Sequence, residues 1–418
     1  MANKAMKILV LALHFGVSGY IGGGWVRFVE LLRRSEKYDI HYVLIEPKPL
    51  FKTKYHRLDY EVEELNVQKS VFKLMIELIL VGLKRARRHD IDLILSPVEN
   101  CYSVLPAFIL SKLTAIPWTA TLQLAPLYGY LVNKNVKTYT SSFRDIYRFL
   151  KLEAVRRATP VSPVIAALIY WITYKAMRSP LMLTSSPTVS EDLKIIDKKI
   201  KTLTCFPGYA IDYERISSIP QQDKKFDLLF TSLSPLKGLF DVINSLTLMV
   251  RKRPETKLAI IGSGSKYIVE QLTEMISARK LFSNVVFPYG VGKGAGLEEI
   301  WKLMGQSKVL IHPSRVESWS LTIGEALTLG LPVITYDIKP IRLAYKNCPA
   351  VFRVPVGNHH DIAEVTLKLL EDKDLYRRVS EAALEYMKHY YSWDDVIKAE
   401  KEAYMKILSY YRKGGRCD

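Results

Sequence analysis

The sequence has 418 residues, of which 49% are hydrophobic and 24% charged, a balance typical of folded globular proteins and unlike disordered or fibrous chains. Its 60 Lys and Arg against 42 Asp and Glu give a net charge of +18, which favours anionic partners such as nucleic acid, anionic lipid or phosphate-bearing substrates. Residues 1–205 hold 30 basic and 17 acidic residues, and residues 206–418 hold 30 and 25, so the first half is the more basic.

The length favours two domains rather than one core. The four cysteines are scattered without disulfide or metal-ligand spacing, which indicates a reducing, cytoplasmic location: Cys101, Cys205, Cys348 and Cys417. The opening run MKILVLAL ends in a Gly-rich turn and has no small-residue cleavage site, so it predicts a first buried strand rather than a signal peptide.

The first half then continues as strand, Gly-rich loop, helix and strand, which is the start of a doubly wound α/β sheet. The patterns predict a strand over 6–13, a helix over 25–34, a strand over 40–46, a helix over 71–90 and a strand over 91–97. The basic cluster Lys84, Arg85, Arg87 and Arg88 fits the negative end of the second helix. The three glycines Gly22, Gly23 and Gly24 between the first strand and helix predict close approach of the backbone to a ligand.

The segment 161–177, VSPVIAALIYWITYKAM, is apolar nearly all round and is short for a membrane span, which needs about 20 residues. Two interpretations are open. It is a buried core helix, or it lies in a membrane interface with Tyr170, Trp171 and Tyr174 at headgroup depth. In the second case its basic flank contacts anionic lipid through Arg156, Arg157, Lys175 and Arg178.

A second α/β series begins near residue 225. Strands are predicted over 225–232, 257–261, 284–290, 308–313 and 331–337, with helices over 233–250 and 321–330. We therefore expect two Rossmann-like lobes joined near 204–216, and a final amphipathic helix from about residue 390. The expected domains are 1–205, 206–389 and 390–418.

Two nucleotide-binding motifs are incomplete. In GSGSKY at 262–267, Tyr267 stands where a dinucleotide fingerprint has its third Gly, and no GK[ST] loop of a P-loop enzyme occurs. The D-x-D at 90–92 fits the polar start of a strand.

The stretch HPSRVESWSLTIGEAL at 312–327 carries two glutamates around the start of a predicted helix. Helix N-terminal amides bind anions, whereas carboxylates accept hydrogen bonds from hydroxyls. A nucleoside diphosphate sugar has both a diphosphate and diols, so we expect Glu317 and Glu325 to hold such a ligand rather than to act only as partners of the helix dipole.

These segments, in the order LSPLKG, AIIGSGS, NVVFPYG and HPSRVESWSLTIGEAL…GLPVI, resemble the C-terminal domain of family-four retaining glycosyltransferases of the GT-B fold. The segment FPGYAIDYERI is similar to that family's interdomain segment, and YSWDD to its closing helix. The resemblance spans essentially the whole chain and is stronger in the second half. It implies two Rossmann-like domains facing across a cleft. Residues 1–205 would bind the acceptor, residues 206–389 would bind the nucleotide sugar, and the helix 390–418 would pack back on the N-terminal domain.

The resemblance also implies roles for individual residues. Glu317 contacts hydroxyls of the transferred sugar, Glu325 holds the ribose diol, and Lys237 binds the donor diphosphate. The remaining donor-binding positions that it implies are the backbone amides of Trp319, Ser320, Leu321 and Thr322, the turn at Gly23 and Gly24, and Ser234, Gly262 and Tyr289. It further implies transfer with retention, no metal in the site, and a departing phosphate that helps deprotonate the acceptor.

The sequence departs from the family pattern at three places. Thr231 and Ser232 stand where an Arg is usual, and we expect Arg315 to replace its charge as a catalytic residue. Ser318 and Ser320 replace two glycines after the first Glu, which stiffens that loop. Gln123 replaces a His after the IPWTATL strand, so a general base is not expected there.

The expected function is therefore hexose transfer from a UDP or GDP sugar to a glycan or lipid-linked acceptor, without a cofactor. The alternatives are a dinucleotide-dependent oxidoreductase and a basic RNA-binding protein, although the sequence shows no aromatic stacking motif of the RRM kind. The protein is expected in the cytoplasm, at the inner face of the cell membrane if the segment 156–178 contacts lipid. The donor base, sugar, acceptor and linkage are left open.

Overall fold

The structure is a computed structural model that describes residues 5–11, 23–47, 61–65, 71–88, 90–126, 140–151, 162–220 and 222–414. The chain divides into two compact units. Unit 1 consists of Met1–Ala210 together with Trp393–Asp418, and unit 2 of Ile211–Ser392. The chain therefore leaves unit 1 once and returns to it with its last helix.

Unit 1 is built on a seven-stranded sheet in the order β3-β2-β1-β4-β5-β6-β7, and its described strand pairs are all parallel. The strands are β1 Met6–Leu11, β2 Ile40–Pro47, β3 Glu61–Leu65, β4 Leu93–Ser96, β5 Trp118–Leu122, β6 Leu181–Thr184 and β7 Lys201–Thr204. The helices are α2 Gly23–Arg34, η1 Glu36–Tyr38, α3 Val71–Arg88, α4 Cys101–Thr114, α6 Phe143–Leu150, α8 Pro163–Ala176, α9 Pro187–Ile196 and α18 Trp393–Arg412. β1 and β4 are fully buried at their centres, because helices cover both faces of a parallel sheet.

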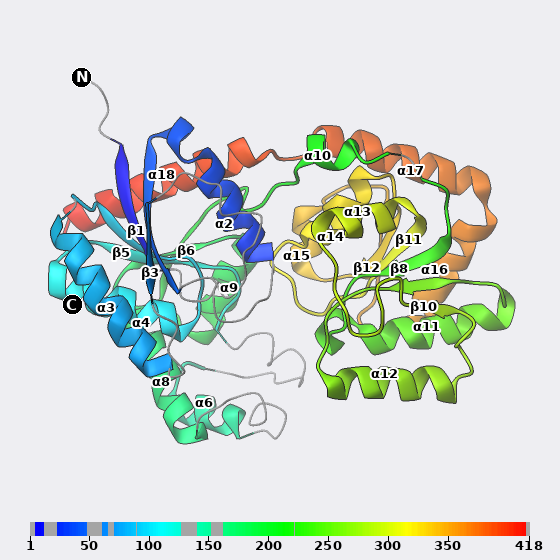
Figure 1. The fold of residues 1–418 in the computed structure, drawn as a ribbon, viewed down its shortest axis with the longest axis horizontal. Coiled ribbons are helices and arrows are strands. Elements are labelled where there is room, and N and C mark those ends of the chain that lie inside the picture. The colour runs from blue at the N-terminus through cyan, green and yellow to red at the C-terminus, as the bar shows by residue number, and fades with distance from the viewer. Residues whose placement is uncertain are drawn as a thin grey trace. The chain divides into compact units, whose positions relative to one another are not determined.

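Unit 2 repeats this plan with six parallel strands in the order β10-β9-β8-β11-β12-β13. The strands are β8 Phe226–Phe230, β9 Leu258–Ile260, β10 Val285–Val286, β11 Ser307–His312, β12 Val333–Tyr336 and β13 Val351–Val354. The helices are α10 Tyr213–Ser217, η2 Pro235–Lys237, α11 Leu239–Lys252, α12 Lys266–Ala278, α13 Leu297–Gly305, α14 Leu321–Thr328, α15 Lys339–Ala344, α16 His359–Glu371 and α17 Lys373–Lys388. The predicted α/β class with two Rossmann-like sheets is confirmed (Figure 1).

Helices lie on both faces of the unit 1 sheet. α2 contacts α18, while α3, α4 and α8 form a separate row in which α4 packs against both neighbours (Figure 1). Right-handed crossovers account for this division, because connections running in opposite directions along a parallel sheet must use opposite faces. The row of α3, α4 and α8 buries Leu74, Leu78, Ala107 and Tyr174 in the main core of the unit.

The returning helix α18 is fixed to unit 1 by a buried ion pair. Arg27 in α2 donates to the carboxylate of Glu400 in α18, and its Nε donates to the Gly208 carbonyl at 2.7 Å. Tyr404 donates its hydroxyl to the other oxygen of Glu400 at 2.7 Å. Burial disfavours charge on Arg27, but Glu400 raises its pKa above the ordinary value, so the guanidinium remains charged.

The helix predicted over 161–177 is α8, Pro163–Ala176. Ala166, Ala167 and Tyr174 are buried, and the Tyr174 hydroxyl donates to the Pro126 carbonyl at 2.7 Å. Its opposite face is exposed, so the helix is neither wholly core nor wholly surface. Arg156 and Arg157 lie outside the described residues. Among the helices that the structure describes, none combines the length and the apolar character needed to cross a bilayer.

Candidate donor-binding site

Three loops of unit 2 meet at the carboxyl ends of β8, β9 and β11. The Arg315 amide donates to the Leu236 carbonyl at 2.9 Å, which joins the loops after β11 and β8. A Cβ at Gly262 would lie 2.9 Å from the Leu233 amide nitrogen, so the loop after β9 also approaches the loop after β8 closely. Since β8 and β11 are neighbours from which the chain proceeds in opposite directions, this is the switch point where open α/β sheets bind ligands.

Gly238 makes the closest of these approaches possible. Its φ is +84°, and a Cβ there would lie 2.3 Å from the Pro313 carbonyl oxygen. A side chain would therefore be disfavoured both by the backbone conformation and by the neighbouring loop. The residue before it, Lys237, ends the short helix η2 and so lies beside the loop that follows β11.

The central contact of the site joins Lys237 and Glu317. The Lys237 Nζ donates to Glu317 Oε1 at 2.5 Å and to the Val316 carbonyl at 3.2 Å. The Nε2 of His312, the last residue of β11, lies 2.9 Å from the same Glu317 oxygen. The carboxylate is almost fully buried, whereas the lysine side chain is 31% exposed. The lysine is therefore the accessible member of the pair.

The charge of Glu317 is set by opposing effects. Burial alone would raise its pKa, but Lys237 and His312 together lower the pKa to about 2. Glu317 is consequently a carboxylate at neutral pH, with acceptor capacity and no proton to give.

Ser320 connects this cluster to the start of α14. Its φ is +70°, a left-handed conformation that is uncommon for residues other than glycine. The hydroxyl of Tyr345 donates to the Ser320 carbonyl at 2.6 Å, and the Ser320 hydroxyl lies 3.0 Å from His312 Nε2. These two contacts hold the strained residue in place, and the amides of Leu321 and Thr322 follow at the first turn of the helix.

Glu325 lies one turn further along α14. Burial raises its pKa from 4.5 to about 7, against a weaker opposing effect of Trp301. Among the residues that the structure describes, no basic side chain forms an ion pair with Glu325. The two glutamates therefore differ: Glu317 is charged by its partners, and Glu325 is close to half protonated near neutral pH.

Three other predicted positions have different surroundings. Arg315 donates to Asp241 at 2.7 Å and its guanidinium lies 5.4 Å from the centre of the Tyr336 ring, so its charge is already engaged by α11. The Trp319 indole is buried and donates to the Tyr390 hydroxyl at 2.8 Å, so its side chain belongs to the core. Tyr289 follows β10 and is exposed.

Neither His312 nor Asp241 was expected from the sequence to belong to the site. His312 ends the apolar run KVLIH, and a polar residue at the carboxyl end of a buried strand is a usable signal for a site residue. Asp241 gave no such signal, because an Asp in the first turn of a helix is common.

Unit 1 presents a second group of side chains at the switch point of its own sheet. A Cβ at Gly24, at the start of α2, would lie 1.8 Å from the side-chain oxygen of Gln123, which follows β5. Glu99 follows β4, and its carboxylate accepts a hydrogen bond from the backbone amide of Gln123 at 3.1 Å. Burial raises the pKa of Glu99. Gly23 and Gly24 thus do begin a helix beside two polar side chains, while Gly22 lies outside the described residues.

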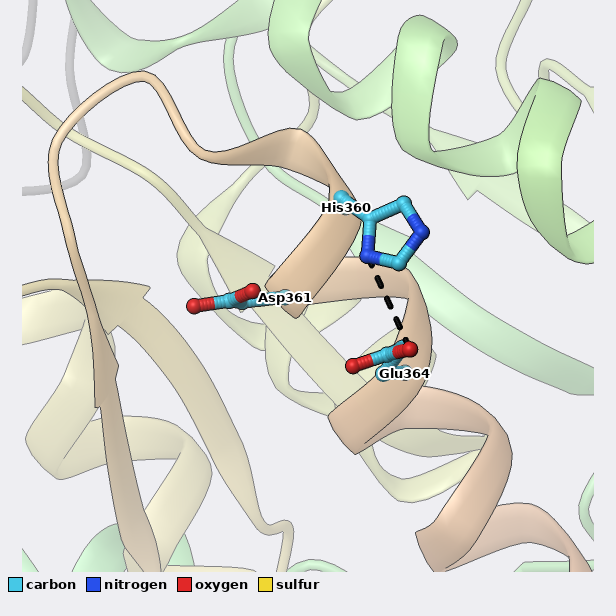
Figure 2. Close-up of side chains that lie close together, drawn as sticks. All are labelled: His360, Asp361 and Glu364. Atoms are coloured by element: carbon cyan, nitrogen blue, oxygen red, sulfur yellow. Dashed lines mark ion pairs between the residues drawn. The ribbon is translucent and has the colours of Figure 1, made fainter.

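One described group of metal-ligand type lies elsewhere in unit 2. His360, Asp361 and Glu364 lie in the first two turns of α16, and Figure 2 shows His360 above Glu364, with a 3.6 Å ion pair between them. Both side chains are exposed, and their spacing of four residues is the ordinary one for neighbours on a helix. This pair accounts for the group without a metal ion.

Comparison with known families identifies the second unit. Residues 212–386 match the family model described as Glycosyl transferases group 1. Those residues are therefore similar to a group 1 glycosyltransferase domain. The domain carries the Lys237, Glu317 and Glu325 side chains described above, and it occupies nearly all of unit 2.

Curated relatives of the group 1 domain include poly(glycerol-phosphate) alpha-glucosyltransferase of Bacillus subtilis (strain 168), 25% identical over 205 residues, and sucrose-phosphate synthase of Zea mays, 27% identical over 180 residues. These alignments cover 48% and 43% of this chain, but only 29% and 16% of the relatives. The chain thus spans less than a third of the length of either relative.

Solved structures extend the likeness of fold to both units. A glycosyltransferase from Rickettsia africae ESF-5 has a TM-score of 0.68 at 16% identity, covering 97% of this chain and 99% of that one. Anabaena HepE in complex with UDP-glucose has a TM-score of 0.69 at 18% identity, covering 96% and 100%. The GT-B fold class expected from the sequence is confirmed, and the oxidoreductase and RNA-binding alternatives receive no support from these similarities.

Proposed function

We propose that this chain is a retaining hexosyltransferase that moves a hexose from a nucleoside diphosphate sugar to a glycan or lipid-linked acceptor. The observation that carries the proposal is the contact between Lys237 and Glu317 at the switch point of a group 1 domain. An accessible cation and a buried carboxylate lie together at the carboxyl ends of the strands. This pair suits a donor that has both a diphosphate and sugar hydroxyls.

In this proposal each side chain of the site binds one chemical group of the donor. Lys237 binds the donor diphosphate, together with the amides of Trp319, Ser320, Leu321 and Thr322 around the start of α14. Glu317 accepts hydrogen bonds from hydroxyls of the sugar, and Glu325 holds the ribose diol. Supporting donor-binding roles are proposed for Gly23, Gly24, Ser234, Gly262 and Tyr289.

The charges of these groups limit what each can do in the reaction. Because the pKa of Glu317 is about 2, this residue does not act as a general acid at neutral pH. Lys237 is placed to stabilise the negative charge that develops on the departing diphosphate. The bond from the anomeric carbon to phosphate oxygen breaks, the bond to the acceptor oxygen forms on the same face, and the acceptor proton passes to the departing phosphate.

Arg315 has a supporting part in this proposal. Its guanidinium is paired with Asp241, so a direct catalytic contact requires that the donor diphosphate draw it away from that carboxylate. We propose no metal ion for the site, since Lys237 and the amides at α14 supply positive charge.

We favour a uridine donor over a guanosine donor. HepE, whose fold matches nearly the whole chain, is described in complex with UDP-glucose, and the Bacillus relative is named as a glucosyltransferase. A cytoplasmic location at the inner face of the cell membrane, with lipid contact through 156–178, is also proposed. A lipid-linked acceptor would agree with that location.

A donor panel tests the proposed function. The full chain is incubated with UDP-glucose, UDP-galactose, UDP-N-acetylglucosamine and GDP-mannose, and release of the nucleotide is followed by chromatography. Slow hydrolysis of at least one donor is expected even without acceptor, and loss of that hydrolysis in Glu317→Gln links it to the site. If no nucleotide sugar binds or is hydrolysed, while a dinucleotide or RNA binds tightly, the proposal fails.

A further inference from the structure

Three neighbouring helices of unit 1 expose a row of large apolar side chains. On α3, Ile76 is 58% and Leu80 is 61% exposed, and on α4 Leu113 is 59% exposed. The exposed apolar residues of the three helices are Phe72, Ile76 and Leu80 on α3, Ile109 and Leu113 on α4, and Val164, Ile165, Leu168 and Ile172 on α8. We call these nine residues the α3–α4–α8 surface. Soluble monomers seldom expose so many large apolar side chains together without using them for binding.

The spacing shows that these side chains form stripes rather than scattered exceptions. Phe72, Ile76 and Leu80 recur every four residues and so share one face of α3. On α8, Leu168 and Ile172 repeat the same interval. The opposite faces are already buried in the core through Leu74 and Leu78 on α3 and Ala166, Ala167 and Tyr174 on α8. The exposed stripes are therefore apolar area beyond what the core requires.

The three stripes are continuous because the helices are neighbours. α4 packs against α3 on one side and against α8 on the other, and Figure 1 shows the three helices following one another along one side of unit 1. All three helices also bury side chains in the same core cluster, so their remaining faces point away from the sheet together.

The exposed charges on these helices have one sign, because their one acidic residue, Glu77, is partly buried. The exposed charged residues of α3, α4 and α8 that the structure describes are all basic: Lys73, Lys84, Arg87, Arg88, Lys112 and Lys175. On both α3 and α8 the apolar stripe runs into a basic residue toward the carboxyl end, Lys84 after Leu80 and Lys175 after Ile172. An apolar face with a basic margin is the pattern of helices that lie in the interface of an anionic bilayer.

We propose that the α3–α4–α8 surface docks on an anionic phospholipid bilayer. The nine apolar side chains enter the boundary between headgroups and acyl chains, and the six basic side chains pair with phosphate at the headgroup level. A two-fold contact between copies of this chain fits less well, because it would bring the basic margins of both copies together. The proposal adds α3 and α4 to the contact expected for 156–178, and it holds whether or not the chain transfers hexose.

Both parts of the surface contribute to vesicle binding. Removing one basic residue weakens binding roughly fivefold at low ionic strength, and this part is screened by salt. Removing two inserted apolar side chains weakens binding roughly tenfold or more, with little dependence on salt. Binding should thus require anionic lipid and apolar side chains at once.

Vesicle flotation with the full chain tests the proposal, without donor or acceptor present. Vesicles contain phosphatidylcholine alone or phosphatidylcholine with about one third phosphatidylglycerol. Wild-type protein should float with the anionic vesicles and be partly released by about 0.5 M salt. Ile76→Gln with Leu80→Gln, and separately Leu168→Gln, should lower binding, and Arg87→Ala with Arg88→Ala should lower it mainly at low salt. Phe282→Gln is the matched control, because Phe282 is 64% exposed in unit 2, outside this surface.

Several outcomes would overturn the proposal. It fails if wild-type protein ignores anionic vesicles, if it binds neutral vesicles equally well, or if the control weakens binding as much as the surface variants. It also fails if light scattering detects a dimer that the Ile76 and Leu80 substitutions dissociate, since a second copy would then be the occupant. Unchanged melting temperatures confirm that the variants are folded. The variant Arg87→Ala with Arg88→Ala tests the charge contribution without altering any apolar residue.

Discussion

The ammonium group of Lys237 lies 2.5 Å from the Glu317 carboxylate, although 80 positions separate the two residues in the sequence. Each residue satisfies the charge of the other before any ligand is present. A donor diphosphate that binds Lys237 must therefore share it with Glu317 or draw it away. His312 would then remain as the partner of the carboxylate, 2.9 Å from the same oxygen.

Lys237→Ala should weaken binding of UDP by about 1.5–3 kcal/mol, because a charge-assisted contact to the diphosphate is lost. Calorimetric titration of UDP measures the change. Uridine lacks phosphate, so its affinity should stay the same, and an equal loss for uridine and UDP would contradict the assignment.

Lys308→Ala is the matched control for that variant. Lys308 and its partner Asp227 lie on β11 and β8, the same two strands, but at their amino ends, and the Lys308 side chain is 35% exposed against 31% for Lys237. The control removes a similar ion pair from the opposite edge of the sheet. UDP affinity should be unchanged, and a loss as large as that of Lys237→Ala would indicate a general effect of charge.

Glu317→Gln should lower turnover by about a hundredfold while leaving UDP affinity within about threefold of the wild type. The amide is nearly isosteric, but it cannot supply a second acceptor oxygen to the sugar hydroxyls. Steady-state kinetics at saturating donor, together with UDP titration, separates the two effects. A variant that lost UDP affinity but turned over normally at saturation would show that the roles of Glu317 and Glu325 had been exchanged.

Glu325→Gln should stabilise the protein in a pH-dependent way. The folded carboxyl has a pKa raised from 4.5 to about 7, so it retains a proton that the unfolded chain has already released. This residue therefore costs stability progressively as the pH rises between those two values, and the full cost, at most about 3 kcal/mol, applies above pH 7.

Thermal unfolding measured at about pH 8.5 and about pH 4.5 tests this expectation. The glutamine variant should melt at a higher temperature than the wild type at the higher pH, and at a similar temperature at the lower pH. A difference that is the same at both values would show that Glu325 does not titrate in this range. The same variant should bind UDP more weakly at every pH, because the ribose diol loses an acceptor.

Removing one member of the buried Arg27–Glu400 pair should strongly destabilise unit 1. Glu400→Ala leaves the guanidinium buried without its carboxylate, which costs about 3–5 kcal/mol. Denaturant unfolding followed by circular dichroism measures the loss. The double variant Arg27→Met with Glu400→Leu should recover part of it, since it buries no charge.

Asp394→Ala serves as the control for this experiment. Asp394 also lies in α18 and pairs with Lys37, but that pair is exposed to solvent. Its removal should leave the unfolding midpoint nearly unchanged. Equal losses for Asp394→Ala and Glu400→Ala would mean that attachment of α18, rather than the buried charge, determines the effect.

Continuous apolar runs made much of the fold predictable. The runs that became β1, β8 and β11 are buried on both sides in parallel sheets, so they lack the alternation that surface strands show, and their continuous apolar character identified them. The face of α8 that contacts the core was not predictable, because Leu168 on its exposed face and Ala167 on its buried face are both apolar.

In the site, residue identity was more predictable than partnership. The family resemblance selected Lys237 and Glu317 individually, but their contact depends on β8 and β11 being adjacent, and strand order is not written in local sequence. Arg315 was expected near the diphosphate for its charge alone. Its pairing with Asp241 depends on the direction in which a long side chain leaves its loop, which sequence spacing does not determine.

Because unit 1 contains both Met1–Ala210 and Trp393–Asp418, its assembly depends on the order of synthesis. Glu400 leaves the ribosome 373 residues after Arg27, which takes roughly 20–75 s at ordinary elongation rates. During that interval the guanidinium of Arg27 has no carboxylate from α18, and by its end all of Ile211–Ser392 has been made. The second unit can therefore fold during translation before the first is complete, and a ribosome that stalls before codon 393 leaves unit 1 without its last helix.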